Sequence, residues 1–343
     1  MKRRTLLKLV GAGAVAEGLA IACGGATTPS ASPTTAATVA ATAAPTLNWP
    51  TQPVTLIVPF AAGGDTDIPM RVVAEFMGKE LGQPVVVQNV AGGSGSTGTR
   101  QAKNAKPDGY TLVSIHEHTI VNQHTGLVDY GPLDLEPIAL LITTAGFVAT
   151  EVSNPWNDAK TLVDDAKKRP NEITWGVTFG STAQMWAYLF MFKTGTKFRP
   201  VGYDGTAQRV TALLGKQIQL GETPLSTLQE HVKAGKLKAL GYGWSARDSR
   251  LPNVPTLKEQ GIDVLFATSR GWAAPKGTPS EILKKLETTL QKVLADPALK
   301  KKIEDGQGNI VEFLPRDKYI EKLKAQDVDL KKVIADTGMK GTP

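Results

Sequence analysis

The stretch VPFAAGGDTD, residues 58–67, joins an apolar run to a helical pattern, and this order decides the fold. The apolar residues Val54–Val58 predict a strand, and Gly63-Gly64 predicts a turn after it. Thr66 or Asp67 is the expected cap of the following helix. Free backbone N–H groups and the helix dipole at such a terminus favour binding of a carboxylate or a phosphate.

Short apolar runs alternate with amphipathic helical segments from Trp49 onward, a pattern typical of α/β folds built from βαβ units. The predicted helices include 68–81 and 182–194. The predicted strands are Val54–Val58, Val85–Val90, Tyr110–Ile115, Ile138–Ile142, Phe147–Val152, Ile173–Val177, Ile218–Leu220 and Leu237–Tyr242.

Two shifts in the pattern, near residues 146–155 and near residues 267–274, predict that the chain crosses twice between two lobes. We expect residues 48–145 and 269–343 to form the first lobe and residues 146–268 to form the second. Two crossings create a hinge and a cleft, and small ligands are usually held in such clefts.

The N-terminal residues predict export. Residues 1–22 combine basic residues with a short apolar run that Glu17 interrupts, which is typical of a signal peptide and too weak for a membrane-spanning helix. The segment KRRTLLK (2–8) resembles a twin-arginine export motif, and the general export route remains the alternative.

Cys23 ends this run in the sequence LAIAC, which resembles a bacterial lipobox. We therefore expect a lipid on Cys23, the alternative being an incidental cysteine in an ordinary signal. Residues 23–47 are rich in Ala, Thr, Ser and Pro and predict a disordered tether. The body of the protein is then expected to lie outside the cytoplasm, anchored to the cell membrane.

The charge balance argues against a nucleic-acid partner. The formal net charge is +7 for the whole chain, and the four basic residues and Glu17 of the export segment account for +3, which leaves +4. Much of the remaining lysine is interleaved with Glu and Asp near the C-terminus, a pattern typical of a solvated helix face. No aromatic and basic motif supports nucleic-acid binding.

One nucleotide fingerprint, the G-x-G-x-x-G of residues 93–98, offers a rival interpretation. Glu117 stands where a ribose-binding acid is found in dinucleotide folds, which would indicate an exported nucleotide-dependent oxidoreductase. Against this, Gln88 and Asn89 break the preceding apolar strand, and residues 106–109 form a turn that leaves room only for a short helix.

The chain lacks the other catalytic signatures, namely G-x-S-x-G, a Walker lysine and HExxH, so we expect no enzymatic activity and no cofactor. His116 and His118 share one face of a predicted strand end at a spacing that two metal ligands could use. With no further cysteine beyond the export segment, a polar wall of the cleft is favoured over a metal site.

Two further turns repeat the chemistry of the opening stretch. Gly180, Ser181 and Thr182 follow the predicted strand 173–177 and begin a helix with hydroxyl caps, and residues 203–206 begin the helix 207–214. Arg270 is the one cation beside a predicted crossing, suited to pairing with a carboxylate. Ordinary capping, and a surface arginine, are the alternatives.

Six motifs occur in the order and spacing of one family. They are VPFAAGGDTD, LGQPVVVQNVAGGSGSTG (81–98), KPDGYTL (106–112), VKAGKLKALG (232–241), LPNVPTLKEQG (251–261) and APKGTP (274–279). The chain resembles the Bug-type receptors, the extracytoplasmic solute-binding components of tripartite tricarboxylate transporters, over residues 49–335. The resemblance implies a type II periplasmic-binding-protein fold of two α/β lobes, which closes over a small carboxylate and delivers it to membrane permease subunits.

The resemblance also implies two grips on the ligand carboxylate, one by the glycine loop of the first lobe and one by a loop of the second lobe. The full set of expected ligand-binding residues is Phe60, Ala61, Gly63, Gly64, Asp65, Thr66, Asp67, His116, His118, Gly180, Ser181, Thr182, Tyr203, Gly205, Thr206 and Arg270. Backbone N–H groups and bridging water are expected to make most of these contacts.

The far end of the ligand is left open by the sequence. Arg270 would favour a second carboxylate, whereas Asp204 and Glu222, if they face the cleft, would favour an amine or hydroxyl groups. A di- or tricarboxylate, an amino acid and an aromatic acid all remain candidates. We expect a monomer, and a ligand-sensing partner of a membrane signalling protein is the alternative role.

Overall fold

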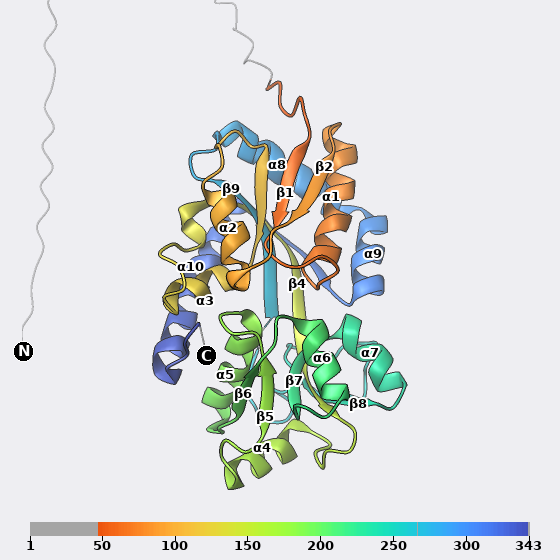
Figure 1. Cartoon of the computed structure of the whole chain (residues 1–343). Helices are drawn as coiled ribbons and strands as arrows, with labels where there is room; N and C mark the ends of the chain where they lie inside the picture. Colours follow the sequence, from red (N-terminus) through yellow and green to blue (C-terminus); the bar gives the residue numbers. More distant parts are fainter. Residues whose placement is uncertain (1–46, 266, 342–343) are drawn as a thin grey trace, which may run out of the picture. The chain divides into compact units, whose positions relative to one another are not determined.

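Strand β4 runs through both halves of the sheet and holds the molecule together (Figure 1). The structure is a computed structural model that describes residues 47–265 and 267–341, apart from the side chains of residues 306 and 307. Its strands are β1 (Val54–Val58), β2 (Val85–Asn89), β3 (Thr111–Ile115), β4 (Leu135–Glu151), β5 (Thr174–Val177), β6 (Arg199–Gly202), β7 (Leu220–Pro224), β8 (Leu237–Tyr242), β9 (Ala267–Pro275) and β10 (Ile310–Leu314).

The first half of the sheet has the order β2-β1-β3-β9-β4, and β10 also pairs with β4. Parallel pairing sets Val54 beside Val85 and Thr55 beside Thr111, as expected for βαβ units. The second half has the order β4-β7-β5-β6, and β8 also pairs with β4. We call these two halves and their helices the first and second lobes.

The crossing between the lobes is a strand rather than a loop. Residues 135–145 of β4 pair with β9, and from Gly146 the same strand pairs with β7 and β8. The sequence pattern predicts two separate strands here, 138–142 and 147–152, and that prediction is wrong because the polar residues Thr143 and Thr144 lie within the pairing. The lobe boundaries themselves remain a prediction.

Helices lie between the parallel strands and across the lobes. They are α1 (Asp67–Leu81), α2 (Ser96–Lys103), α3 (His118–His124), α4 (Ala159–Lys168), α5 (Thr182–Thr194), α6 (Thr206–Leu214), α7 (Leu225–Lys233), α8 (Ser280–Ala295), α9 (Pro297–Gln307) and α10 (Arg316–Thr337), with short turns η1 (Gly93–Gly95) and η2 (Pro132–Asp134). Helix α10 packs against α3 in the first lobe and α5 in the second, so it adds a third connection.

The second lobe has an aromatic core. The ring of Trp175 on β5 lies 5.1 Å from the ring of Phe198 and 5.3 Å from that of Phe190, between ring centroids. Trp186 on α5 packs against the same ring at 6.0 Å. Because Trp175 is fully buried, this cluster packs β5 firmly against α5.

The α/β prediction is confirmed, and most strand positions agree with it. The sequence pattern misses β6, β9 and β10. Strand β9 escapes detection because Ser269 and Arg270 interrupt its apolar character, although both are buried in the structure. The pattern also places His118 at a strand end, which is wrong because His118 begins α3.

Candidate functional site

Asp67 fixes the conformation of the glycine loop, residues 59–66, between β1 and α1. One carboxylate oxygen of Asp67, Oδ2, accepts from the Gly63 N–H at 2.8 Å and from Arg71 Nε at 2.9 Å, and the other accepts from Asn89 Nδ2 at 2.8 Å. Asn89 also donates to the Phe60 carbonyl at 3.0 Å. Burial acts to raise the pKa of Asp67, but these hydrogen bonds outweigh it and lower the pKa. Asp67 therefore shapes the loop instead of facing a solute.

Three backbone N–H groups at the start of α1 are left without an acceptor among the described residues, those of Asp65, Thr66 and Asp67. The helix they begin has 15 residues, and Thr66 as N-cap makes no side-chain capping bond. Unpaired N–H groups at the positive end of a helix dipole can bind an anion. Ala61, Gly63 and Asp65 are exposed, although Thr66 and Asp67 are buried, so the loop in front of this helix end is open to solvent.

Arg270 is brought to the glycine loop and is almost completely buried, with 1% exposure. Its Nη2 pairs with Asp65 Oδ2 at 2.7 Å, and its Nε donates to Thr66 Oγ1 at 3.0 Å. Nη1 donates to Thr144 Oγ1 at 2.5 Å, which ties the loop to β4. Thr144 is missed by the sequence analysis, since it reads as an ordinary polar residue between two strands.

His116 and His118 pack against the ring of Phe60, a residue of the glycine loop. The Phe60 ring is 5.1 Å from each imidazole, and the two imidazoles are 4.2 Å apart, between ring centroids. Burial and the charge of Arg270 lower the pKa of His118 to about 3, and burial together with His118 and Arg270 lowers that of His116. Both histidines are neutral near pH 7, and His118 is fully buried at 0% exposure.

The buried neutral histidines predict a loss of stability in mild acid. The folded-state pKa of His118 is about 3 and the ordinary value is 6.5, so the unfolded chain takes up the proton first as the pH falls. The free energy of unfolding should therefore decrease between pH 6.5 and about 3, by at most about 1.4 kcal/mol per pH unit for this residue.

Urea unfolding of the wild type and of His118→Gln, measured from pH 7 to pH 4, checks this. We expect the variant to be less stable at pH 7 but to lose less stability on acidification. Equal pH dependence in the two proteins would contradict the assignment of a neutral, buried His118.

In the second lobe, the turn after β5 presents the start of α5. Ser181 Oγ accepts from the Ala183 N–H at 3.1 Å and donates to the Thr178 carbonyl at 2.7 Å. The Gly180 N–H is bound by Gln184 Oε1 at 2.7 Å. Within the described residues the Thr182 N–H has no acceptor, so α5 offers the same kind of open helix end as α1.

Arg209 on α6 is a buried cation that the sequence analysis misses. Its guanidinium donates to Thr178 Oγ1 at 2.9 Å and to Thr206 Oγ1 at 3.1 Å, and it pairs with Glu222 Oε2 at 3.3 Å. Burial lowers the pKa of Arg209 and raises that of Glu222. One sequence feature could have pointed to Arg209. It is the only basic residue in α6, the helix that begins at the hydroxyl-bearing turn of residues 203–206.

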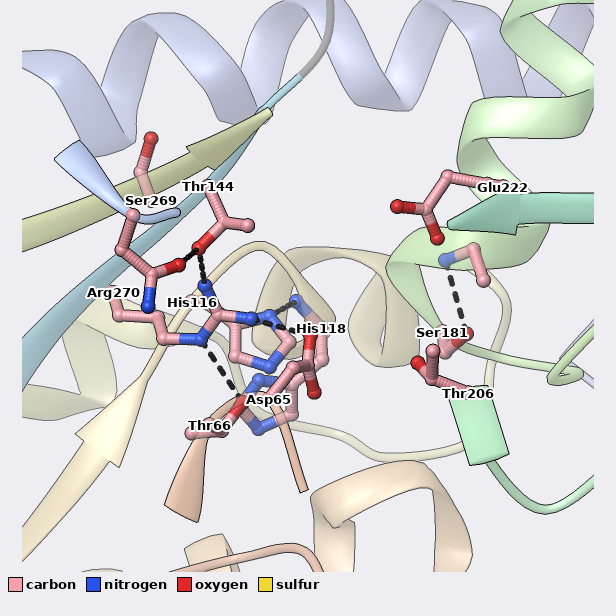
Figure 2. Close-up of polar contacts among 12 residues, drawn as sticks. Asp65, Thr66, His116, His118, Thr144, Ser181, Thr206, Glu222, Ser269 and Arg270 are labelled. Atoms are coloured by element: carbon pink, nitrogen blue, oxygen red, sulfur yellow. Dashed lines mark hydrogen bonds and ion pairs between the residues drawn. The ribbon is translucent and has the colours of Figure 1, made fainter. Parts of the chain in front are cut away.

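These two groups of side chains face each other. Figure 2 shows Arg270, Asp65, Thr66 and the histidines on one side and Ser181, Thr206 and Glu222 on the other. Burial raises the pKa of Glu222 on the second side, and the negative charge of Asp65 on the first side raises it further. We call this region the inter-lobe site.

Other members of the expected set lie near α6. Gly205 is the N-cap of α6, and Thr206 is its first residue. Tyr203 is partly buried, and its N–H donates to the Val177 carbonyl at 2.8 Å. Asp204 is exposed, whereas the Glu222 side chain is 17% exposed within the inter-lobe site.

The nucleotide fingerprint has a different role. Its turn η1 contacts the second lobe, because Ser94 Oγ donates to the Phe179 carbonyl. Glu117 is buried and accepts from the Ser269 N–H at 3.0 Å and from Gln326 Nε2 at 2.7 Å, so it is not free to bind a ribose. Among the described residues, no group of three or more His, Cys, Asp or Glu side chains is placed to hold a metal ion.

A cavity of about 550 Å³ lies apart from the glycine loop. It is lined by residues of α5 and α10 together with Glu117 and Ser269, and no residue of the loop 59–66 contributes to it. The predicted signal, tether and lipidated Cys23 lie outside the described residues. In the part of the chain that the structure covers, no helix is both long and apolar enough to cross a membrane.

Known proteins that are similar in sequence and in fold identify the family of this chain. A family model described as the tripartite tricarboxylate transporter family receptor matches residues 69–339. Protein BugT of Bordetella pertussis is 32% identical over 258 residues, covering 73% of this chain and 79% of BugT. A solved periplasmic transporter is 32% identical with a TM-score of 0.78, covering 86% of this chain and 100% of that one.

A Rhodopseudomonas palustris protein solved with adipate is 27% identical with a TM-score of 0.77, covering 85% of this chain and 99% of that one. The predicted resemblance and the periplasmic-binding-protein fold are thereby confirmed. The family consists of receptors, so the oxidoreductase alternative is wrong. The chain belongs to the tripartite tricarboxylate transporter receptor family of extracytoplasmic solute-binding proteins.

Proposed function

We propose that this receptor captures a small carboxylate at the inter-lobe site and delivers it to the membrane subunits of a tripartite transporter. The observation that carries the proposal is the pair of open helix ends, α1 in the first lobe and α5 in the second, on the two sides of one site. Among the described residues, the start of α1 has three unpaired N–H groups and the start of α5 has one, that of Thr182. Such groups bind a carboxylate without any need for a nucleophile, a base or a metal.

The free energies are sufficient for a useful affinity. A hydrogen bond to a charged group contributes about 1.5–3 kcal/mol, and a helix terminus contributes about 0.3–2 kcal/mol. Several such contacts together can reach the roughly 8 kcal/mol of micromolar binding after the entropic cost of association. The relative solved with adipate supports a carboxylate as the class of ligand.

Closure of the lobes is proposed as the mechanism of capture. The hinge would lie where β4 leaves the first half of the sheet at Gly146 and where β9 begins at Ala267. Contacts between the lobes, such as Gln184 Nε2 to the Lys340 carbonyl at 3.1 Å, would adjust during closure. A lipid on Cys23 would keep the receptor near the permease, and a monomer would suffice for both steps.

A thermal-shift screen of the purified protein against mono-, di- and tricarboxylates, amino acids and aromatic acids tests the proposal. A ligand present at 100 times its Kd stabilises the folded state by about 2.7 kcal/mol, which should raise the Tm by several degrees. Asp164→Asn, an exposed change on α4, is the control and should respond as the wild type does. No response to any acid would contradict carboxylate capture.

A further inference from the structure

We propose that the Asp65 carboxylate pairs with Arg270 at the position where the second carboxylate of a dicarboxylate solute would otherwise bind. The receptor then prefers solutes with one carboxylate and a cationic or hydrogen-bond-donating far end. This inference rests on the proposed capture of a small carboxylate and specifies the class of solute that the inter-lobe site accepts.

Arg270 has no free charge to offer a ligand. Its Nε, Nη1 and Nη2 each have a partner, and the partner of Nη2 is the carboxylate of Asp65 at 2.7 Å. A guanidinium with 1% exposure requires a counter-charge, because burial of an unpaired cation is costly. The chain supplies that counter-charge itself, so a ligand does not need to.

Asp65 remains open toward the site. Its side chain is 41% exposed, although its partner Arg270 is buried. Only Oδ2 is engaged, and Oδ1 has no hydrogen bond within the described residues. Asp65 therefore presents a free acceptor close to the unpaired N–H groups of the glycine loop.

The second lobe repeats the arrangement. Arg209 is paired with Glu222 through Oε2, and Glu222 Oε1 has no hydrogen bond in the part of the chain that the structure describes. Each lobe thus contributes one arginine that is already ion-paired and one carboxylate with an oxygen that accepts no hydrogen bond from the described residues. A second carboxylate of a solute would meet two acids and, among the described residues of this site, two arginines that are already ion-paired, whereas an ammonium group would meet two acceptors.

Three probes of equal chain length separate these cases: glutarate, 5-aminopentanoate and pentanoate. Their four-carbon counterparts succinate, 4-aminobutanoate and butanoate repeat the comparison. For the wild type we expect the amino acid to bind at least about tenfold more tightly than the dicarboxylate of the same length, measured by isothermal titration calorimetry. Asp65→Asn keeps the size of the side chain and an oxygen for Arg270 but removes the charge.

Asp65→Asn should shift the affinity ratio at least about tenfold toward the dicarboxylate, because the charge of Arg270 is then uncompensated. Glu222→Gln, on the opposite lobe, should shift the ratio in the same direction without touching the glycine loop. Asp164→Asn changes the net charge equally at an exposed site and should leave the ratio unchanged. Urea unfolding of each variant verifies that it is folded.

The inference is overturned if the wild type prefers the dicarboxylates, or if neither Asp65→Asn nor Glu222→Gln changes the ratio while carboxylates still bind. In both cases the proposed function stands. If no probe binds to the wild type or to either variant, capture of small carboxylates fails, and the inference fails with it.

Discussion

Replacing Asp67 with alanine is expected to lower the free energy of unfolding by about 3 kcal/mol and to abolish solute binding. The Asp67 carboxylate is buried and holds the glycine loop through Gly63, Asn89 and Arg71. Its removal leaves the Gly63 N–H and the Asn89 amide without this partner, so the loop loses the shape that presents its N–H groups. Urea unfolding measures the first effect and calorimetric titration the second.

Two further variants provide comparisons for the loss of stability in Asp67→Ala. Asp67→Asn keeps one acceptor oxygen and should lose roughly half as much stability. Asp164→Asn removes an exposed pairing with Lys160 and should change the free energy of unfolding by less than about 0.5 kcal/mol. Wild-type binding by a folded Asp67→Ala protein would show that the loop does not depend on this carboxylate.

Replacing Trp175 with alanine is expected to cost about 3–5 kcal/mol of stability, the usual cost of removing a large buried aromatic side chain. The ring is in contact with the aromatic rings of Phe190 and Phe198 and has 0% exposure. Its loss leaves a cavity between β5 and α5. The midpoint of urea unfolding is the measurement.

Phe192→Ala on α5 is the matched control, because that ring is 44% exposed and should contribute far less. Trp175→Phe should be milder than Trp175→Ala, since the indole N–H has no partner within the described residues and its removal costs no hydrogen bond. A Trp175→Ala protein as stable as Phe192→Ala would contradict the packing described for this lobe.

The sequence was sufficient to predict the glycine loop, the caps of α1 and α5 and most strands, because these depend on short-range patterns. Val54–Val58 and Leu237–Tyr242 are found where the apolar runs predict them. Ser181 caps α5 as a hydroxyl before a helix is expected to. The order of the family motifs supplied the fold as a whole.

Pairings between distant residues were not predictable in this way. Arg270 meets Thr144 because β4 and β9 lie side by side, and it meets Asp65 because β9 is separated only by β3 from β1, the strand that leads into the glycine loop. Arg209 meets Glu222 only because α6 packs on β7. No local pattern in the sequence marks an acid as the partner of a particular arginine. The charge balance of the inter-lobe site, and hence its selectivity, therefore requires the structure.

The position of β9 makes completion of the first half of the sheet depend on a late part of the chain. This strand lies between β3 and β4 in the first half of the sheet, yet residues 267–275 are made only after the whole second lobe. A nascent chain ending near residue 145 therefore has β1, β2 and β3, which pair with one another, and the start of β4, but lacks the strand that lies between β3 and β4. We therefore expect the first half of the sheet to be completed only when residues 267–275 are available, after the strands of the second half.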